Sequence, residues 1–413
     1  MSVLLRRMVI SFIGLTVVSM SWAQSQRYTW RDLSKPASAI ACERMIRLND
    51  QGDVLGMCTF KGGTRKTKDY WLGEGINLFP YYRYTTWYYE KPIVWAANGT
   101  TRLLETPVRS SIYSMGITNT GRVLASVYAL NSSGLPEFQL QNLSRQGTSL
   151  TSTPLTIPAD IGARPVSILY VLKNGTIGLA ADTERNATWR ISSAGLLLPP
   201  LPVLPANPTT VVDFENNRCE NEQGFSIQSR QFSITPSSST PWVNTAFEYW
   251  FNDGASWQEI KVSNNHSINH FNSNNSNNSN NRCPINARGQ VLLETNLGVT
   301  TNPNSVIGYE NMEFQLWTAG AGSIVLPQGR WSRLNDTGVV IGEIASTIDK
   351  AGSHGATYVN GQLTDLNKVT SNVPYNKVLR TPLDINNKGQ IVGWSTDSSV
   401  ANGAIRLVVL TPQ

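Results

Sequence analysis

A short motif recurs along this chain and restricts the folds open to it. Its clearest copy is Ile-Asn-Asn-Lys-Gly at residues Ile385 to Gly389, followed by the apolar pair Ile391-Val392. A type I turn favours Asn or Asp at its first position and Gly at its fourth. The glycine can adopt positive φ and begin the return strand. The motif therefore predicts a β-hairpin.

Seven copies of this hairpin can be aligned on the turn glycine. The first, fifth, sixth and seventh are clear, the second is intermediate, and the third and fourth keep less of the pattern; their glycines are Gly52, Gly121, Gly175, Gly224, Gly289, Gly338 and Gly389. Successive glycines are about 50 to 70 residues apart, and the shorter intervals match the length of a four-stranded propeller blade.

The two ends of the chain complement each other. Each hairpin is followed by an aromatic or apolar strand and a further strand, but the last copy, beginning at Ala404, ends at Gln413 without that further strand. The segment Tyr28 to Leu33 precedes the first hairpin and resembles Leu363 to Leu366 of the sixth repeat. Pairing the ends would close a ring and remove its exposed edges. We predict an all-β protein, a seven-bladed β-propeller closed by an N-terminal strand, with six or eight blades as alternatives.

The N-terminus has the features of a secretory signal peptide. Arg6 and Arg7 precede the mostly apolar run Met8 to Met20, and Ser21-Trp22-Ala23 provides a cleavage site. We expect cleavage after Ala23, a single propeller domain over residues 24–413, and a secreted or periplasmic location. The apolar run is too short to span a bilayer, and no second one follows.

Charge and cysteine content agree with export. The 34 Lys and Arg residues fall to 32 without Arg6 and Arg7, against 28 Asp and Glu, so the mature chain carries only +4. This weak charge is not that of a nucleic-acid-binding protein. Four cysteines in an oxidising compartment suggest two disulfides. Cys42 and Cys58 should face each other across the Gly52 turn; Cys219 with Cys283 is the pair that remains, with free buried thiols as the alternative.

Two long insertions are expected on one face of the disc. One lies between the second and third strands of a blade and the other links two blades, and both kinds of connection should lie on the same face. Residues 262–281 are rich in Asn and Ser and cannot form a core. Residues 61–91 are rich in aromatic residues, and the ligand-binding candidates there are Trp71, Tyr81, Tyr82, Tyr84, Trp87, Tyr88 and Tyr89. Flat rings with polar edges suit a glycan or protein surface. The alternative is a small satellite core that supports a long loop.

Motifs of common enzyme classes are missing from the sequence. It has no Gly-rich phosphate loop, zinc-protease helix or nucleophile elbow. His266 and His270 have no third ligand nearby, so we predict no metal and no cofactor. His354 is expected to be a loop residue without a partner. A carboxylate pair assembled from different blades stays open, because a single sequence would not reveal it.

The repeated pattern, of the type Ile-Asn-x-x-Gly-x-Val-x-Gly and best matched in the last three copies, resembles the bacterial extracellular repeat proteins of the HAF family. The resemblance implies a secreted β-rich repeat protein and carries no catalytic residues. We expect a monomeric, non-enzymatic binding module that contacts a glycan or an extracellular protein through its long-loop face. The alternatives are a polysaccharide-active hydrolase or lyase, and a structural component of the cell surface or matrix.

Overall fold

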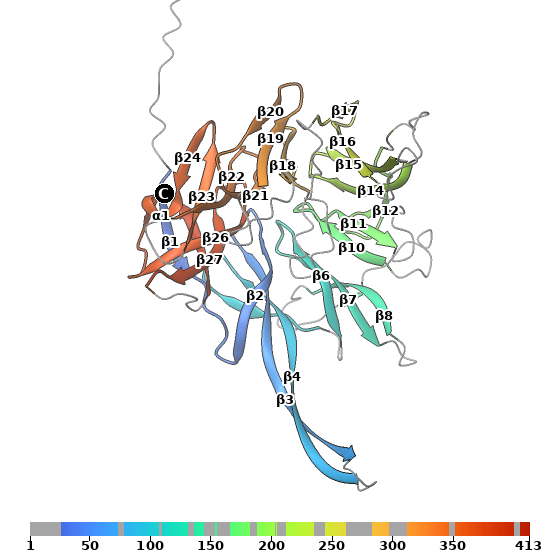
Figure 1. The fold of residues 1–413 in the computed structure, drawn as a ribbon, viewed down its shortest axis with the longest axis vertical. Helices are drawn as coiled ribbons and strands as arrows, with labels where there is room; N and C mark the ends of the chain where they lie inside the picture. The colour runs from blue at the N-terminus through green and yellow to red at the C-terminus, as the bar shows by residue number, and fades with distance from the viewer. Residues whose placement is uncertain are drawn as a thin grey trace, which may run out of the picture.

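The computed structural model shows an all-β protein whose blades are arranged around a central axis (Figure 1). It describes residues 26–72, 78–106, 110–130, 136–143, 153–154, 166–181, 188–202, 204, 212–234, 244–261, 283–296, 312–346, 352–399 and 405–413. The expected signal peptide and the Asn/Ser-rich insertion lie outside the described residues.

Seven sheets form the seven blades of a β-propeller, as predicted. Blades 1 to 3 comprise β2–β5 (Ala39–Leu48, Val54–Leu72, Leu78–Trp95, Thr101–Leu103), β6–β9 (Ser111–Ile117, Val123–Leu130, Pro136–Asn142, Thr153–Pro154) and β10–β13 (Val166–Val171, Ile177–Ala181, Thr188–Ile191, Leu197–Leu198). Blades 4 to 6 comprise β14–β17 (Val212–Glu220, Ser226–Ile234, Asn244–Asn252, Trp257–Glu259), β18–β20 (Gln290–Asn296, Met312–Thr318, Gly322–Val325) and β21–β24 (Arg330–Leu334, Val340–Ala345, Ser353–Val359, Gln362–Asp365). Blade 7 comprises β26–β28 (Lys377–Ile385, Ile391–Asp397, Arg406–Pro412) with β1 (Tyr28–Asp32).

Blade 5 departs from the four-strand pattern. Its sheet has three strands, and its innermost position holds only an isolated bridge between Ile285 and Val291. The turn that follows Ile285 is nevertheless formed, because the Gly289 N–H donates to the Asn286 carbonyl at 3.1 Å.

The predicted turn glycines all have positive φ, between 69° at Gly289 and 91° at Gly52 and Gly175. In each turn the glycine N–H donates to the carbonyl of the turn's first residue, including Leu172 in blade 3 and Asn221 in blade 4. The two copies with the weakest sequence match are therefore blades like the others.

The N-terminal strand closes the ring. β1 pairs antiparallel with β28, so that Trp30 lies opposite Leu410. On its other side, β1 pairs in parallel with β25 (Thr370–Ser371), which follows the short helix α1 (Leu366–Val369). The closing strand thus lies between two segments from the C-terminal part of the chain. This confirms the predicted closure.

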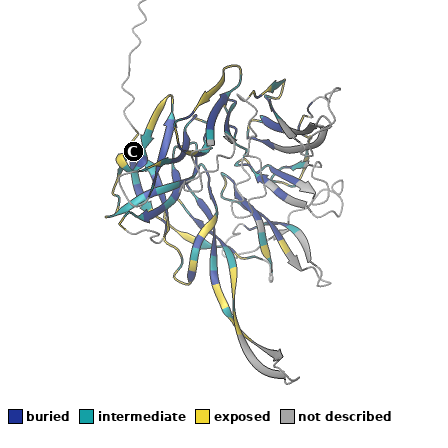
Figure 2. Ribbon diagram, in the orientation of Figure 1, coloured by how far each residue is buried: buried dark blue, intermediate teal, exposed yellow. Residues whose placement is uncertain are grey.

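The core lies between neighbouring blades and within them (Figure 2). Across the closing seam, Val392 and Val409 of blade 7 belong to one buried cluster with Leu48 and Trp95 of blade 1. At the same seam the Asp384 carboxylate accepts a hydrogen bond from the Leu48 N–H at 2.8 Å. No helix in the described part of the protein is long and apolar enough to cross a membrane.

The turn asparagines join the blades to one another. In blade 6 the Asn335 Oδ1 accepts hydrogen bonds from the Thr337 and Val339 N–H groups, while its Nδ2 donates to the Asn386 carbonyl of blade 7 at 3.0 Å. The same bond runs from Asn286 to Asn335 and from Asn221 to Asn286.

This series of bonds also crosses the closing seam. The Asn386 Nδ2 donates to the Asn49 carbonyl of blade 1 at 2.9 Å, and the Asn49 Nδ2 donates to the Thr118 carbonyl of blade 2 at 2.9 Å. The turn asparagine therefore stabilises its own hairpin with its oxygen and the ring of blades with its nitrogen.

Replacing Asn335 by Ala should lower the free energy of unfolding by about 2–4 kcal/mol, because buried N–H and C=O groups lose their partners. Denaturant unfolding would measure this. Asn98→Ala is the matched control: the Asn98 oxygen also accepts bonds within a turn, but at the exposed surface. This control should cost less than about 1 kcal/mol; equal losses would contradict the role of the inter-blade bond.

Alkaline pH should test the closing strand. Burial raises the pKa of Tyr28 to about 12 from its usual 10.0. The stabilisation from the neutral phenol is present below pH 10 and is lost as the pH rises toward 12, a loss of about 2–3 kcal/mol. Tyr28→Phe should remove this component, so the stability difference between wild type and variant should change between pH 10 and pH 12. The exposed-site control Tyr375→Phe should show no such change.

Candidate functional site

Blade 1 carries an extension that we call the arm: residues 61–72 of β3 and 78–91 of β4. The sequence suggested a long loop, but the two strands stay paired from Val54↔Trp95 to Leu72↔Leu78. The arm projects away from the ring of blades (Figure 1).

The base of the arm is anchored to blade 1. Cys42 of β2 and Cys58 of β3 form the predicted disulfide, with their Cα atoms 4.0 Å apart. Beside it, the Arg44 guanidinium lies 2.7 Å from the Glu90 carboxylate of β4. Both contacts join β2 to the two arm strands, so they hold the arm in a fixed direction.

One face of the arm carries Trp87 and Tyr89. Tyr89 stacks on the buried Phe60 with ring centroids 5.3 Å apart, and Trp87 lies 5.9 Å from Tyr89. Trp87 also covers the backbone where a bulge interrupts β3, because a Cβ on Gly62 would come within 2.2 Å of the indole. Trp87 nevertheless remains 53% exposed.

The opposite face carries Tyr84, Thr86 and Tyr88. The Lys66 ammonium lies 5.8 Å from the Tyr84 ring centroid, and the Thr64 and Thr86 hydroxyls are 3.4 Å apart. Tyr84 is 64% exposed and Tyr88 58% exposed. Four of the seven sequence-predicted binding residues, including Tyr89 at 38% exposure, are thus accessible to solvent on a paired two-stranded ribbon.

The other three candidates are placed only by backbone. Trp71 lies in β3 and pairs with Phe79, while Tyr81 and Tyr82 lie in β4 opposite Asp69 and Lys68. Their side chains lie outside the described residues.

On the face of the ring that carries the short Asn-to-Gly turns, polar groups surround the central axis. Each contact there joins different blades: the Lys173 ammonium is 2.7 Å from the Asp50 carboxylate, and Asp50 also accepts a bond from the Asn387 N–H. Burial raises the pKa of Asp50, but Lys173 and these hydrogen bonds outweigh it and lower the pKa below its usual value. Asp336 accepts from the Ala287 N–H and the Asn387 side chain.

A cavity of about 60 Å³ lies beside these groups, lined in part by Lys173, Glu222 and Asp336. Such a volume accommodates ordered water rather than a sugar ring. The carboxylates at this mouth accept hydrogen bonds from neighbouring blades, which favours a structural role for them.

A His–Asp pair lies on the outer side of blade 6. The His354 Nδ1 is 2.9 Å from the Asp365 carboxylate, and both border a cavity of about 420 Å³. Burial alone would raise the pKa of the Asp365 carboxyl. The hydrogen bond to His354 and the positive charge on that imidazole outweigh burial, so the pKa is lowered. Asp365 also caps helix α1 through the Asn367 N–H. The expectation of a partnerless loop histidine was therefore wrong: His354 is a buried residue of β23.

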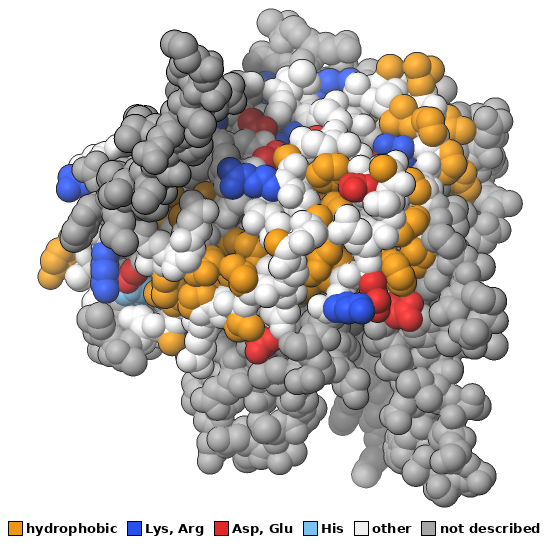
Figure 3. Space-filling view, turned by 90° about the horizontal axis from the view of Figure 1, so that it is seen from above, with side chains coloured by type: hydrophobic (Ala, Val, Ile, Leu, Met, Phe, Trp, Pro, Cys, Tyr) orange, Lys and Arg blue, Asp and Glu red, His pale blue; other side chains and the backbone are white. Residues whose placement is uncertain are grey.

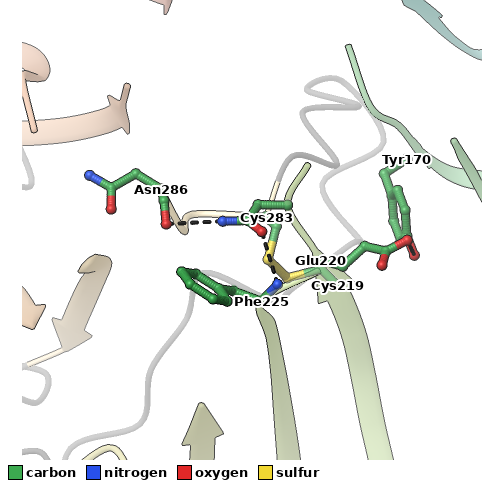
Figure 4. The surroundings of a disulfide bond; sticks show 7 residues. Tyr170, Cys219, Glu220, Phe225, Cys283 and Asn286 are labelled. Atoms are coloured by element: carbon green, nitrogen blue, oxygen red, sulfur yellow. Dashed lines mark hydrogen bonds between the residues drawn. A yellow bond between two sulfur atoms is a disulfide. The ribbon is translucent and has the colours of Figure 1, made fainter. Parts of the chain in front are cut away.

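The second disulfide joins blades 4 and 5. Cys219 of β14 bonds to Cys283, which precedes β18, as the remaining pair in the sequence suggested (Figure 4). Next to it, the buried Glu220 carboxylate pairs with Arg190 at 2.6 Å and accepts a bond from the Tyr170 hydroxyl.

Among the described residues on the face shown in Figure 3, Lys and Arg side chains lie in small groups beside acidic ones and a band of hydrophobic residues. Among the described residues, no cluster of three or more His, Cys, Asp or Glu side chains has the arrangement of a metal site.

Three features escaped the sequence analysis: the hairpin nature of the arm, the inter-blade asparagine bonds and the His354–Asp365 pair. The arm had a signal in Thr64, Thr67, Thr85 and Thr86, since β-branched residues are frequent in strands. The asparagine bonds join different blades, and the His354–Asp365 pair joins the adjacent strands β23 and β24, so both depend on how the strands pair and have no signal in the sequence itself.

Comparison with known proteins gives only fold-level likenesses. No protein-family model and no curated sequence matches the chain. Among solved structures, the β-propeller domain of the Trilobed protease from Pyrococcus furiosus is 8% identical, with a TM-score of 0.45, covering 90% of this chain and 94% of that one. Polysaccharide lyase Uly1 is 10% identical, with a TM-score of 0.47 and coverage of 95% and 94%. An α-L-arabinanase from Penicillium chrysogenum is 11% identical, with a TM-score of 0.31 and coverage of 93% and 98%.

Removing the two disulfides should destabilise the protein to different extents. Cys42 and Cys58 are separated by 16 positions and Cys219 and Cys283 by 64. In the chain-entropy description the losses are about 3 and about 4 kcal/mol, because the longer loop gains more freedom when unfolded. Denaturant unfolding of the two double Cys→Ser variants would compare them. A larger loss for the Cys42/Cys58 variant would contradict this ordering.

Proposed function

We propose that this protein is a secreted, non-enzymatic binding module that contacts a glycan through the arm of blade 1. The observation that carries the proposal is the exposure of Tyr84, Trp87 and Tyr88 on a paired, disulfide-anchored hairpin. The cysteine pairs and the sequence resemblance to extracellular repeat proteins support an extracellular role.

The chemistry around the rings favours a sugar over an apolar protein partner. Tyr84 and Tyr88 are separated on their face by Thr86, and the Lys66 ammonium lies over the Tyr84 ring, 5.8 Å from its centroid. Aromatic faces can stack on the C–H groups of a sugar ring, while hydroxyl and ammonium groups bind its oxygens. A protein partner would be expected to meet a more continuous apolar patch.

The arm also needs little rearrangement to bind. Trp87 is held over the Gly62 bulge and Tyr89 is held by Phe60. Side chains that are already ordered lose less entropy on binding, which raises affinity for a given contact. A few stacking contacts of this kind support dissociation constants of about 1 μM to 1 mM.

A glycan array followed by calorimetry would test the proposal on wild type and on the variant Trp87→Ala/Tyr88→Ala/Tyr89→Ala. The variant should bind at least about tenfold more weakly, because the loss of ring contacts exceeds 1.4 kcal/mol. Tyr375→Ala is the matched control, since Tyr375 is 90% exposed but lies in the segment before β26, outside the arm.

Two outcomes would reject the proposal. One is glycan binding that survives the triple substitution. The other is the absence of binding to every array glycan together with capture of an extracellular protein through the same rings, which would establish the protein-binding alternative. Unchanged melting of the variant would show that lost binding is not lost folding.

A further inference from the structure

We propose that two copies of this protein associate by pairing the outer edges of their β4 strands, so that two arms form one four-stranded sheet. This inference concerns the backbone edge of the arm and stands whether or not the arm binds a glycan.

The outer edge of β4 is open over the length of the arm. In the described residues, β4 pairs with β3 throughout, but it pairs with β5 only at Ile93–Trp95. An isolated two-stranded ribbon is at best marginally stable in water. An open strand edge is also a template for a further strand. The arm therefore has both a reason and a surface for pairing.

The hydrogen bonds of β4 show which of its backbone N–H and C=O groups point away from β3. The Pro92 carbonyl points outward, because it accepts a hydrogen bond from the Leu104 N–H on the β5 side. Outward-facing residues alternate along a strand. The outward-pointing backbone groups therefore belong to every second residue counted back from Pro92, including Tyr88, Thr86, Tyr84 and Pro80. Both prolines lie where their missing N–H costs the hairpin nothing, as expected for an edge strand.

The edge is self-complementary. Thr86 lies midway between Pro80 and Pro92, so antiparallel pairing about a two-fold axis at Thr86 joins Tyr82–Glu90 of one copy to the same residues of the other and stops before Pro92, whose carbonyl is already bonded to the Leu104 N–H. Every outward N–H between the prolines then meets a carbonyl of the second copy. Tyr84 lies opposite Tyr88 of the second copy, which is a favourable aromatic cross-strand pair.

Charge selects β4 over β3 for this contact. Residues Tyr84 to Tyr89 form an uncharged run, and the flanking Arg83 and Glu90 meet uncharged Tyr89 and Tyr82 in this register. The arm part of β3 instead carries four cations and a single acidic residue, Asp69; the cations are Lys61, Arg65, Lys66 and Lys68. Pairing β3 with itself would bring these cations together, which is destabilising. The observations thus favour a second copy joined through β4, although the sequence alone suggested a monomer.

The test compares proline substitutions at the two residues of one cross-strand pair. Thr64 and Thr86 face each other in β3 and β4, and their N–H groups point to opposite edges of the arm. Thr86→Pro removes an outward N–H from the β4 edge, whereas Thr64→Pro does the same to the β3 edge. Both lose the same hydroxyl contact, so they differ only in the edge affected.

Light scattering coupled to size exclusion, without ligand, should give twice the monomer mass for wild type and Thr64→Pro. It should give the monomer mass for Thr86→Pro. If a proline perturbs the arm, Thr86→Lys and Thr64→Lys repeat the comparison, because lysines at position 86 would meet across the two-fold axis.

A monomeric wild type at micromolar concentration would overturn the proposal. So would a dimer that survives both substitutions at Thr86, or one that the two Thr64 variants weaken equally. None of these outcomes depends on glycan binding, so the dimer and the proposed function can fail separately.

Discussion

The hydrogen bond from a turn asparagine to the carbonyl of the next blade is the contact on which the rest of the structure depends. It needs an amide in the donor blade but only a backbone oxygen in the acceptor blade, as between Asn49 and Thr118. A blade can therefore lose its own asparagine and still be held by its predecessor. This explains why blade 2, with Thr118 at the turn position, keeps its place in the ring. It also explains how the bond from Asn386 to Asn49 reinforces the closure made by β1. Blade 3, with Leu172 at the turn position, is joined to blade 2 by a different bond, from the Asn119 N–H to the Lys173 carbonyl at 2.7 Å.

The sequence predicted what depends on local chemistry and missed what depends on distant contacts. The turn at Asn386–Gly389 follows from the conformational preferences of its first and last residues. The closure of the ring follows from the strand that the last repeat lacks before Gln413 and the additional strand that begins at Tyr28. The second role of Asn386, as a donor to Asn49, is set by the curvature of the ring. The sequence predicts a loop for the arm because its residues lack the alternation of apolar and polar types that normally marks a strand. The partner of His354 lies on β24 and could be found only from the sheet register.

The ring also explains why the arm, and not the axis, is the place for recognition. At the axis the carboxylates of Asp50 and Asp336 are used by backbone and side-chain donors of adjacent blades, and the space there is about 60 Å³. Groups that hold the blades together cannot exchange partners for a ligand without weakening the ring. The described rings of the arm instead contact other arm residues, Trp87 with Tyr89 and Tyr84 with Lys66. Evolution of its surface is therefore free of the packing constraints of the blades.

The two proposed uses of the arm draw on different parts of the same residues. Tyr84, Thr86 and Tyr88 present their backbone N–H groups at the edge and their side chains on one face, so a shared sheet would not cover the rings. Pairing would instead place four tyrosines on one continuous face, two from each copy. A polymeric glycan bound to the arm of one copy would then meet the arm of the second copy at a high effective concentration. Its overall affinity would rise without any new type of contact. The edge would thus determine how many rings act together, while the rings determine what is bound.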